Sequence, residues 1–171
     1  MNKHFIPKTE FTVLLASSKS DNKQKENDRI KLWFNIADRI LRDWNGVSYS
    51  FLKSLTPGQS ALVCIAQFHR GAAHDLISSI TESQLPSLTL KAFETIQAHE
   101  YLELLKTVEA VFPGKKFPEY AEDVLAALRK QPTDYFKIVA DSFVAGKGMR
   151  QPLYDYVFEY VSTHPEDFCI V

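Results

Sequence analysis

The sequence predicts an all-α protein, an irregular bundle of six to seven helices in one domain. Apolar residues recur with a period of about 3.6 in every long segment, which is the spacing of an amphipathic helix. The connections between these segments are short, and no convincing run of alternating apolar and polar residues follows residue 16. A chain of 171 residues suits one domain and buries enough surface to fold without a disulfide or a metal.

The first 26 residues are expected to form an N-terminal segment that is partly mobile. Residues 11–16 are apolar, but a run this short does not distinguish a strand from a helical turn. Residues 17–26 are polar and rich in Ser, Asn and Lys, with no apolar anchor, a composition that favours mobility. A single helical domain then spans residues 27–171 and starts with a helix over residues 27–44, whose apolar stripe continues for four turns.

Thr56 and Pro57 predict the start of the next long helix, with Thr56 as the N-cap. Proline suits the first helical position because its missing N–H group would have no partner there. This helix is expected to reach about Arg70 and, being apolar on nearly all sides, to be the most buried. Gly71 is expected to end or bend it, and residues 72–80 to continue as a further helical piece.

The longest predicted helix spans residues 87–112. Its continuous apolar stripe comprises Phe93, Ile96, Tyr101, Leu104, Leu105, Val108 and Phe112. Further helices are expected over residues 118–130, 133–145 and 152–163, since proline or glycine stands at their ends. In the last of these, Tyr154 and Phe158 lie off the main apolar line. They indicate either a second core contact or a subunit contact, so a homodimer is one hypothesis.

A net charge of −1 conceals an uneven distribution along the chain. Residues 1–70 carry 11 Lys and Arg against 6 Asp and Glu, whereas residues 71–171 carry 9 against 15. Such asymmetry is expected where one half binds a charged partner, or where two folded halves neutralise one another. The densest acidic set is Glu94, Glu100, Glu103, Glu109, Glu119, Glu122 and Asp123. It is the candidate surface for docking a basic protein partner, and an ordinary solvated helix face is the alternative interpretation.

The sequence carries no motif of an established enzyme or metal site: CxxC, HExxH and GxSxG are all missing. No cofactor or metal is therefore expected. The alternative function, a small hydrolase or metal enzyme, would be centred on His69, His74 and Asp75. The two histidines are five residues apart, rather than the four that align ligands on one helix face.

Composition also bounds the location and the partners. Two cysteines make no disulfide framework, no secretory signal opens the chain, and a cytoplasmic protein is expected. No apolar stretch approaches the roughly 20 residues of a membrane span, so no membrane partner is expected. Direct nucleic-acid binding is not expected either, because Trp33, Phe34 and Trp44 lie on the apolar stripe of their helix rather than beside the basic residues.

Four stretches between residues 55 and 171 follow the pattern of a known family. Leu55-Thr56-Pro57-Gly58-Gln59 looks like its Leu-Thr-x-Gly-Gln helix opener, and Arg70-Gly71-Ala72-Ala73-His74-Asp75 stands where it typically has Asn-Gly-Gly-Phe-His-Gln. Residues 92–113 and 154–168 look like its long helix and its closing helix. On these grounds residues 55–171 resemble a bacterial family of unknown function whose best-known member is an acidic DNA-mimic protein.

The resemblance implies an all-helical domain, often dimeric, that works by binding another protein. It suggests a regulator or inhibitor of a nucleic-acid-binding protein, with Arg70, Gly71, His74 and Asp75 in the family's loop. This chain replaces the family's Asn, second Gly and Phe with Arg70, Ala72 and Ala73. Its net charge of −1 also does not make a polyanion, so mimicry of DNA, which carries one charge per roughly 1.7 Å, is doubtful.

Overall fold

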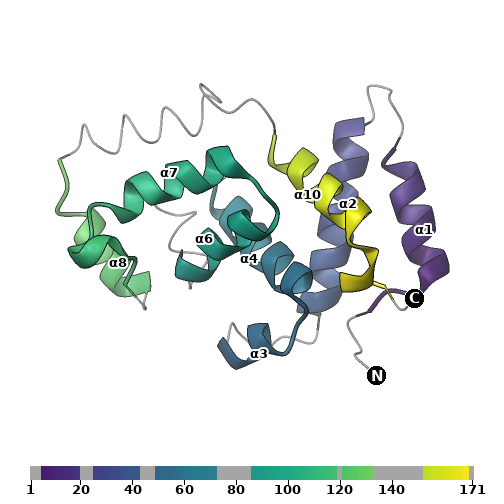
Figure 1. Ribbon diagram of the computed structural model, residues 1–171, viewed down its shortest axis with the longest axis horizontal. Helices are drawn as coiled ribbons and strands as arrows, with labels where there is room; N and C mark the ends of the chain where they lie inside the picture. The colour runs from purple at the N-terminus through teal and green to yellow at the C-terminus, as the bar shows by residue number, and fades with distance from the viewer. Residues whose placement is uncertain are drawn as a thin grey trace. The chain divides into compact units, whose positions relative to one another are not determined.

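The computed structural model describes residues 5–19, 25–42, 49–72, 86–118, 121–132 and 152–169. Every regular element in these ranges is a helix (Figure 1), so the prediction of an all-α protein is confirmed. The chain falls into two compact units. Unit 1 comprises residues 1–63 and 151–171, and unit 2 comprises residues 64–150. This division does not test whether residues 27–171 fold as a single domain, which stays a prediction.

Unit 1 contains α1 (Lys8–Ser17), α2 (Lys25–Leu41), α3 (Tyr49–Lys53), the start of α4 (Pro57–Ala72), α10 (Leu153–Thr163) and the 3-10 helix Pro165–Asp167. Helix α10 packs against α2, and α1 contacts α2 as well (Figure 1). The predicted stripe of α2 is buried, with Trp33 and Ile36 among its core residues. Residues 11–16, whose apolar pattern fits either a strand or a helical turn, are helical and form the middle of α1.

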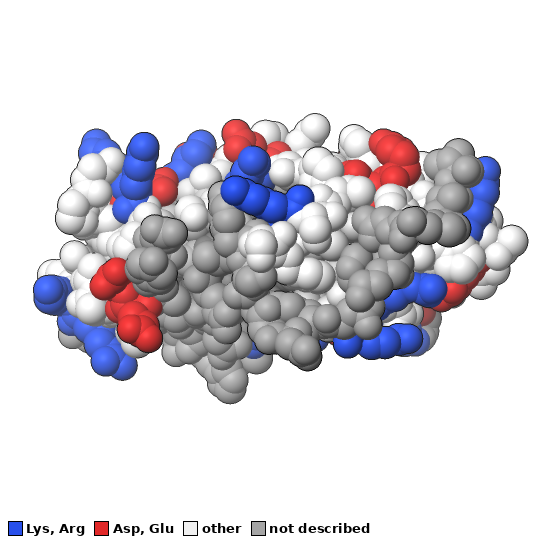
Figure 2. All heavy atoms as spheres, turned by 90° about the horizontal axis from the view of Figure 1, so that it is seen from below, with Lys and Arg blue, Asp and Glu red and all other residues white. Residues whose placement is uncertain are grey.

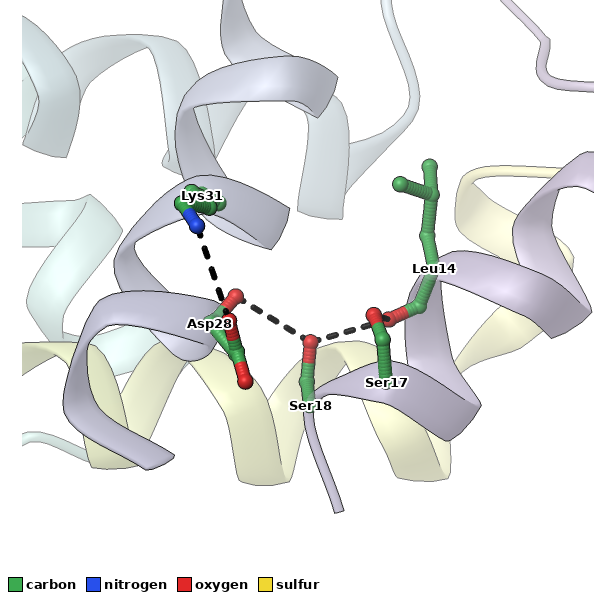
Figure 3. A network of polar contacts seen from close by, with 5 residues as sticks. All are labelled: Leu14, Ser17, Ser18, Asp28 and Lys31. Carbon is green, nitrogen blue, oxygen red and sulfur yellow. Dashed lines mark hydrogen bonds and ion pairs between the residues drawn. The ribbon is translucent and has the colours of Figure 1, made fainter. Parts of the chain in front are cut away.

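Ser18 joins the end of α1 to α2 (Figure 3). Its buried hydroxyl lies 2.9 Å from the carbonyl oxygen of Leu14 and 3.2 Å from that of Asp28, and can donate to either. The sequence offers no apolar anchor within residues 17–26, but the polar side chain of Ser18 attaches the end of α1 to α2. Lys25 and Glu26 already belong to α2, so the expectation that the mobile stretch reaches residue 26 is wrong there. Residues 20–24 lie outside the described residues, so their mobility stays a prediction.

Helix α4 begins as predicted. The hydroxyl of Thr56 accepts the N–H of Gln59 at 3.2 Å, and the side-chain oxygen of Gln59 accepts the N–H of Thr56 at 3.3 Å. This reciprocal pair is a capping box, which satisfies two backbone donors at the start of a helix. The side chains of residues 61–66 are all buried, which confirms the expected burial of this helix. Gly71 lies inside α4, which continues to Ala72, so the helix does not end at the glycine.

Unit 2 contains the rest of α4, α6 (Pro86–Thr95), α7 (His99–Glu109), the 3-10 helix Pro113–Lys115 and α8 (Ala121–Leu128). The rings of Phe68 and Phe93 meet edge to face with their centroids 5.2 Å apart, and Phe93 stacks on Tyr101 at 5.3 Å. Helix α8 is shorter than predicted. The helices expected over residues 72–80 and 133–145 lie almost entirely outside the described residues.

The prediction of one continuous helix over residues 87–112 is wrong. Helix α6 ends at Thr95, and Gln97 has a left-handed backbone with φ 56°. The N–H of Ala98 donates to the carbonyl of Phe93 at 2.9 Å, and the N–H of Gln97 donates to that of Glu94 at 3.1 Å. These two bonds form a Schellman motif, in which the left-handed residue is usually glycine. Its glutamine gave no stop signal, while the stripe stayed largely buried on both sides of the break.

Candidate functional site

The seven acidic candidates differ in what their side chains do. Three are exposed and have no ion-pair or hydrogen-bond partner among the described residues: Glu94 on α6, and Glu122 and Asp123 on α8. Carboxylates in this state keep their full capacity to accept hydrogen bonds. They are therefore the members of the set that are available to another molecule.

The other members are already engaged or lie outside the described residues. The exposed carboxylate of Glu103 pairs with the ammonium group of Lys106 at 3.1 Å, within α7. Glu109 accepts the backbone N–H of Phe117 at 3.1 Å, so its carboxylate holds the turn that follows α7. Glu100 is half-buried and makes contacts of its own, and Glu119 lies outside the described residues. Docking by the whole set of seven therefore stays a prediction, and its members differ in how free their carboxylates are.

The two halves of the sequence differ in net charge, but the two compact units of the fold do not. Residues 1–63 carry 10 Lys and Arg against 6 Asp and Glu, and residues 151–171 add no Lys or Arg and 4 Asp and Glu. Unit 1 is therefore neutral, and unit 2, with 10 against 11, is nearly so. Figure 2 shows acidic and basic side chains interspersed on the face that it presents. This favours the interpretation in which oppositely charged segments neutralise one another.

Arg29 and Asp155 are one such neutralising pair. The guanidinium group of Arg29, on α2, is bonded to the carboxylate of Asp155, on α10, and lies 4.1 Å from the ring centroid of Phe158. A cation over an aromatic ring is attracted by the negative face of the ring. The side of α10 that carries Phe158 therefore packs inside unit 1. This leaves the homodimer hypothesis without the support that Phe158 was expected to give.

Of the three residues proposed for the alternative enzyme, only His69 lies within the described residues. His69 is half-buried on α4, where burial lowers the pKa of its imidazole below the usual value. Arg70 is exposed in the last turn of α4, whereas His74 and Asp75 lie outside the described residues. In the ranges given above, no three His, Cys, Asp or Glu side chains are grouped closely enough to hold a metal ion. The alternative stays a hypothesis.

Sequence reasoning missed a polar cluster at the start of α4. One carboxylate oxygen of Asp167 accepts the N–H of Gly58 at 3.1 Å and the hydroxyl of Tyr160 at 2.8 Å. The Thr56 hydroxyl donates to the backbone carbonyl of Asp167 at 3.0 Å. A carboxylate is stabilised at a helix N-terminus because the N–H groups there lack partners and the helix dipole is positive.

The cluster explains why glycine stands at position 58. A Cβ atom there would lie 2.5 Å from the carboxylate of Asp167 and 2.8 Å from the ring of Tyr160. Burial, together with the bond to Asp167, raises the pKa of Tyr160, so its hydroxyl stays a donor. The cluster joins the segment of residues 55–59 to the segment of residues 154–168. No local pattern in the sequence indicates that residues more than 100 positions apart meet.

No protein-family model matches the chain, and neither the search of curated proteins nor the search of solved structures finds a match. Within the described part of the chain, no helix combines the length and the apolar character needed to cross a membrane.

Proposed function

We propose that this protein is a non-enzymatic protein-binding module, and that its partner contacts the exposed carboxylates of unit 2. The observation that carries the proposal is the state of Glu94, Glu122 and Asp123, which are exposed and unpaired among the described residues. Exposed ion pairs each contribute about 0–1 kcal/mol, so several such carboxylates must act together to hold a partner.

The chemistry of these carboxylates fits a basic protein surface. Lysine and arginine side chains of a partner would bond to them, and the attraction would weaken as salt screens it. The family resemblance of residues 55–171 supports the same class of function and suggests a nucleic-acid-binding protein as the partner, with this chain as its regulator or inhibitor. Because both units are close to neutral, we expect a local contact rather than imitation of a DNA duplex.

The test compares two triple variants as affinity baits in lysate from the source cells. One carries Glu94→Gln, Glu122→Gln and Asp123→Asn. The matched control carries Glu26→Gln, Glu159→Gln and Glu166→Gln, which removes three exposed carboxylates from unit 1. Mass spectrometry should show a protein that binds the parent and the control but not the unit 2 variant. A partner retained equally by all three baits would contradict the proposed surface, and stoichiometric metal in the purified protein would favour the alternative enzyme.

A further inference from the structure

We infer that residues 164–169, here called the clasp, hold α1 in place, and that releasing the clasp frees α1 while α2 and α10 stay packed. The inference concerns a conformational device and does not rest on the proposed function. It follows from how the clasp is fixed, what it contacts at the N-terminal end of the chain, and how little else holds α1.

The clasp is fixed at its centre by Asp167. The two bonds to its carboxylate, from Gly58 and Tyr160, and the bond from Thr56 to its carbonyl tie it to α4 and to α10. The ring of His164 stacks on that of Tyr160, with the centroids 4.3 Å apart. These contacts set the position of Phe168, the next residue along the chain.

The far side of the clasp holds the segment that leads into α1. The N–H of Ile6 donates to the carbonyl of Phe168 at 2.8 Å, and Ile6 forms a parallel bridge with Cys169. The ring of Phe11 stacks on that of Phe168, with the centroids 6.5 Å apart, and the side chains of Ile6, Phe11 and Phe168 are all buried.

Within the part of the chain that the structure describes, the remaining attachments of α1 are few. Phe11 is its only buried residue, and Val13 keeps 69% of its surface exposed. Glu10 pairs with Arg39 of α2 at 3.0 Å, but both side chains are partly exposed and such pairs contribute little. Ser18 ties only the end of the helix to α2. Among the described ring contacts, Phe11 with Phe168 is the one that α1 makes.

The rest of unit 1 has packing that does not involve α1. Helices α2 and α10 contact each other directly, through a buried apolar stripe and the pair of Arg29 with Asp155. Segments with few buried contacts open at lower free energy than the packed core, and they open as cooperative pieces. Residues 5–17 have the contacts of such a piece, and the clasp is the part that closes it.

Amide hydrogen exchange of the full chain tests this. Phe168→Ala removes the ring contact with Phe11, Asp167→Ala removes the carboxylate that accepts from Gly58 and Tyr160, and Glu166→Gln changes an exposed neighbour as the control. In both clasp variants the amides of residues 8–17 should exchange about tenfold faster, while those of α2 and α10 change less than about twofold. The control should leave all of them unchanged.

Two results would overturn the inference. In one, the exchange of α1 is the same in the parent and in the clasp variants. In the other, α2 and α10 accelerate as much as α1, which would mean that unit 1 opens as a whole. If Phe168→Ala unfolds the protein, Asp167→Ala decides between these outcomes, because it leaves the aromatic core intact.

Discussion

Gly58→Ala should destabilise the protein, although alanine normally favours a helix over glycine by about 1 kcal/mol. The new methyl group would lie 2.5 Å from a carboxylate oxygen of Asp167 and 2.8 Å from the ring of Tyr160. Overpacking costs about 1–3 kcal/mol, and losing a hydrogen bond to a charged group costs about 1.5–3 kcal/mol. After the helix gain is subtracted, the expected loss is about 1.5–5 kcal/mol.

Urea denaturation followed by circular dichroism measures this loss. Ser60→Ala, two residues along α4, is the matched control and should change stability by less than about 0.5 kcal/mol, because Ser60 makes no contact with the clasp in the described hydrogen bonds. In the background of Asp167→Ala the cost of Gly58→Ala should shrink, because the nearest atom is gone. A Gly58→Ala variant as stable as the parent would show that the carboxylate of Asp167 does not pack against the start of α4.

Three further outcomes are expected. Gln97→Gly should stabilise the protein by about 0.5–1 kcal/mol in urea denaturation, because glycine relieves the left-handed backbone at φ 56°. Lys91→Gly, inside α6, should instead cost about 1 kcal/mol of stability. A loss of stability at both positions would contradict the helix break. Leu105→Ala should cost about 2–5 kcal/mol, since this side chain is buried in α7, and an unchanged melting temperature would show that it faces elsewhere. Burial raises the pKa of Cys64 from 9.0 to about 12 and also raises the pKa of Cys169, so both thiols stay protonated at pH 8. A disulfide reagent should therefore label these two buried cysteines only after the protein unfolds. Rapid labelling of the native protein would refute their burial.

The helices with local signals were predictable from the sequence. The start of α4 follows from Thr56 and Pro57, because a capping residue and a proline act within one turn. The stripe of α2 predicts its buried face, because an apolar period of 3.6 places these side chains on one side of the helix. Cys64 is buried, as its place within the apolar run of residues 61–66 indicates.

The features that the sequence did not reveal depend on contacts between distant residues or on an unusual backbone. The break at Gln97 uses a residue that gives no stop signal, so the stripe looked continuous. The clasp joins Asp167 to Gly58, and no local period encodes such a pairing.

Charge was misleading for a related reason. The acidic residues of the second half include Asp155, which folds against Arg29 of the first half. Counting charges along the chain could not separate carboxylates that neutralise a neighbour from those that stay exposed, such as Glu122. Only the structure therefore shows which of the seven acidic candidates are exposed and unpaired among the described residues.

The salt dependence of binding to the captured partner tests the central claim most directly. The parent should bind more weakly as salt rises, because screening reduces the attraction between exposed charges. The variant with Glu94→Gln, Glu122→Gln and Asp123→Asn should bind more weakly at low salt and show a flatter dependence, while the unit 1 control should match the parent. Equal affinity and equal salt dependence for the parent and the unit 2 variant would contradict a docking role for these carboxylates.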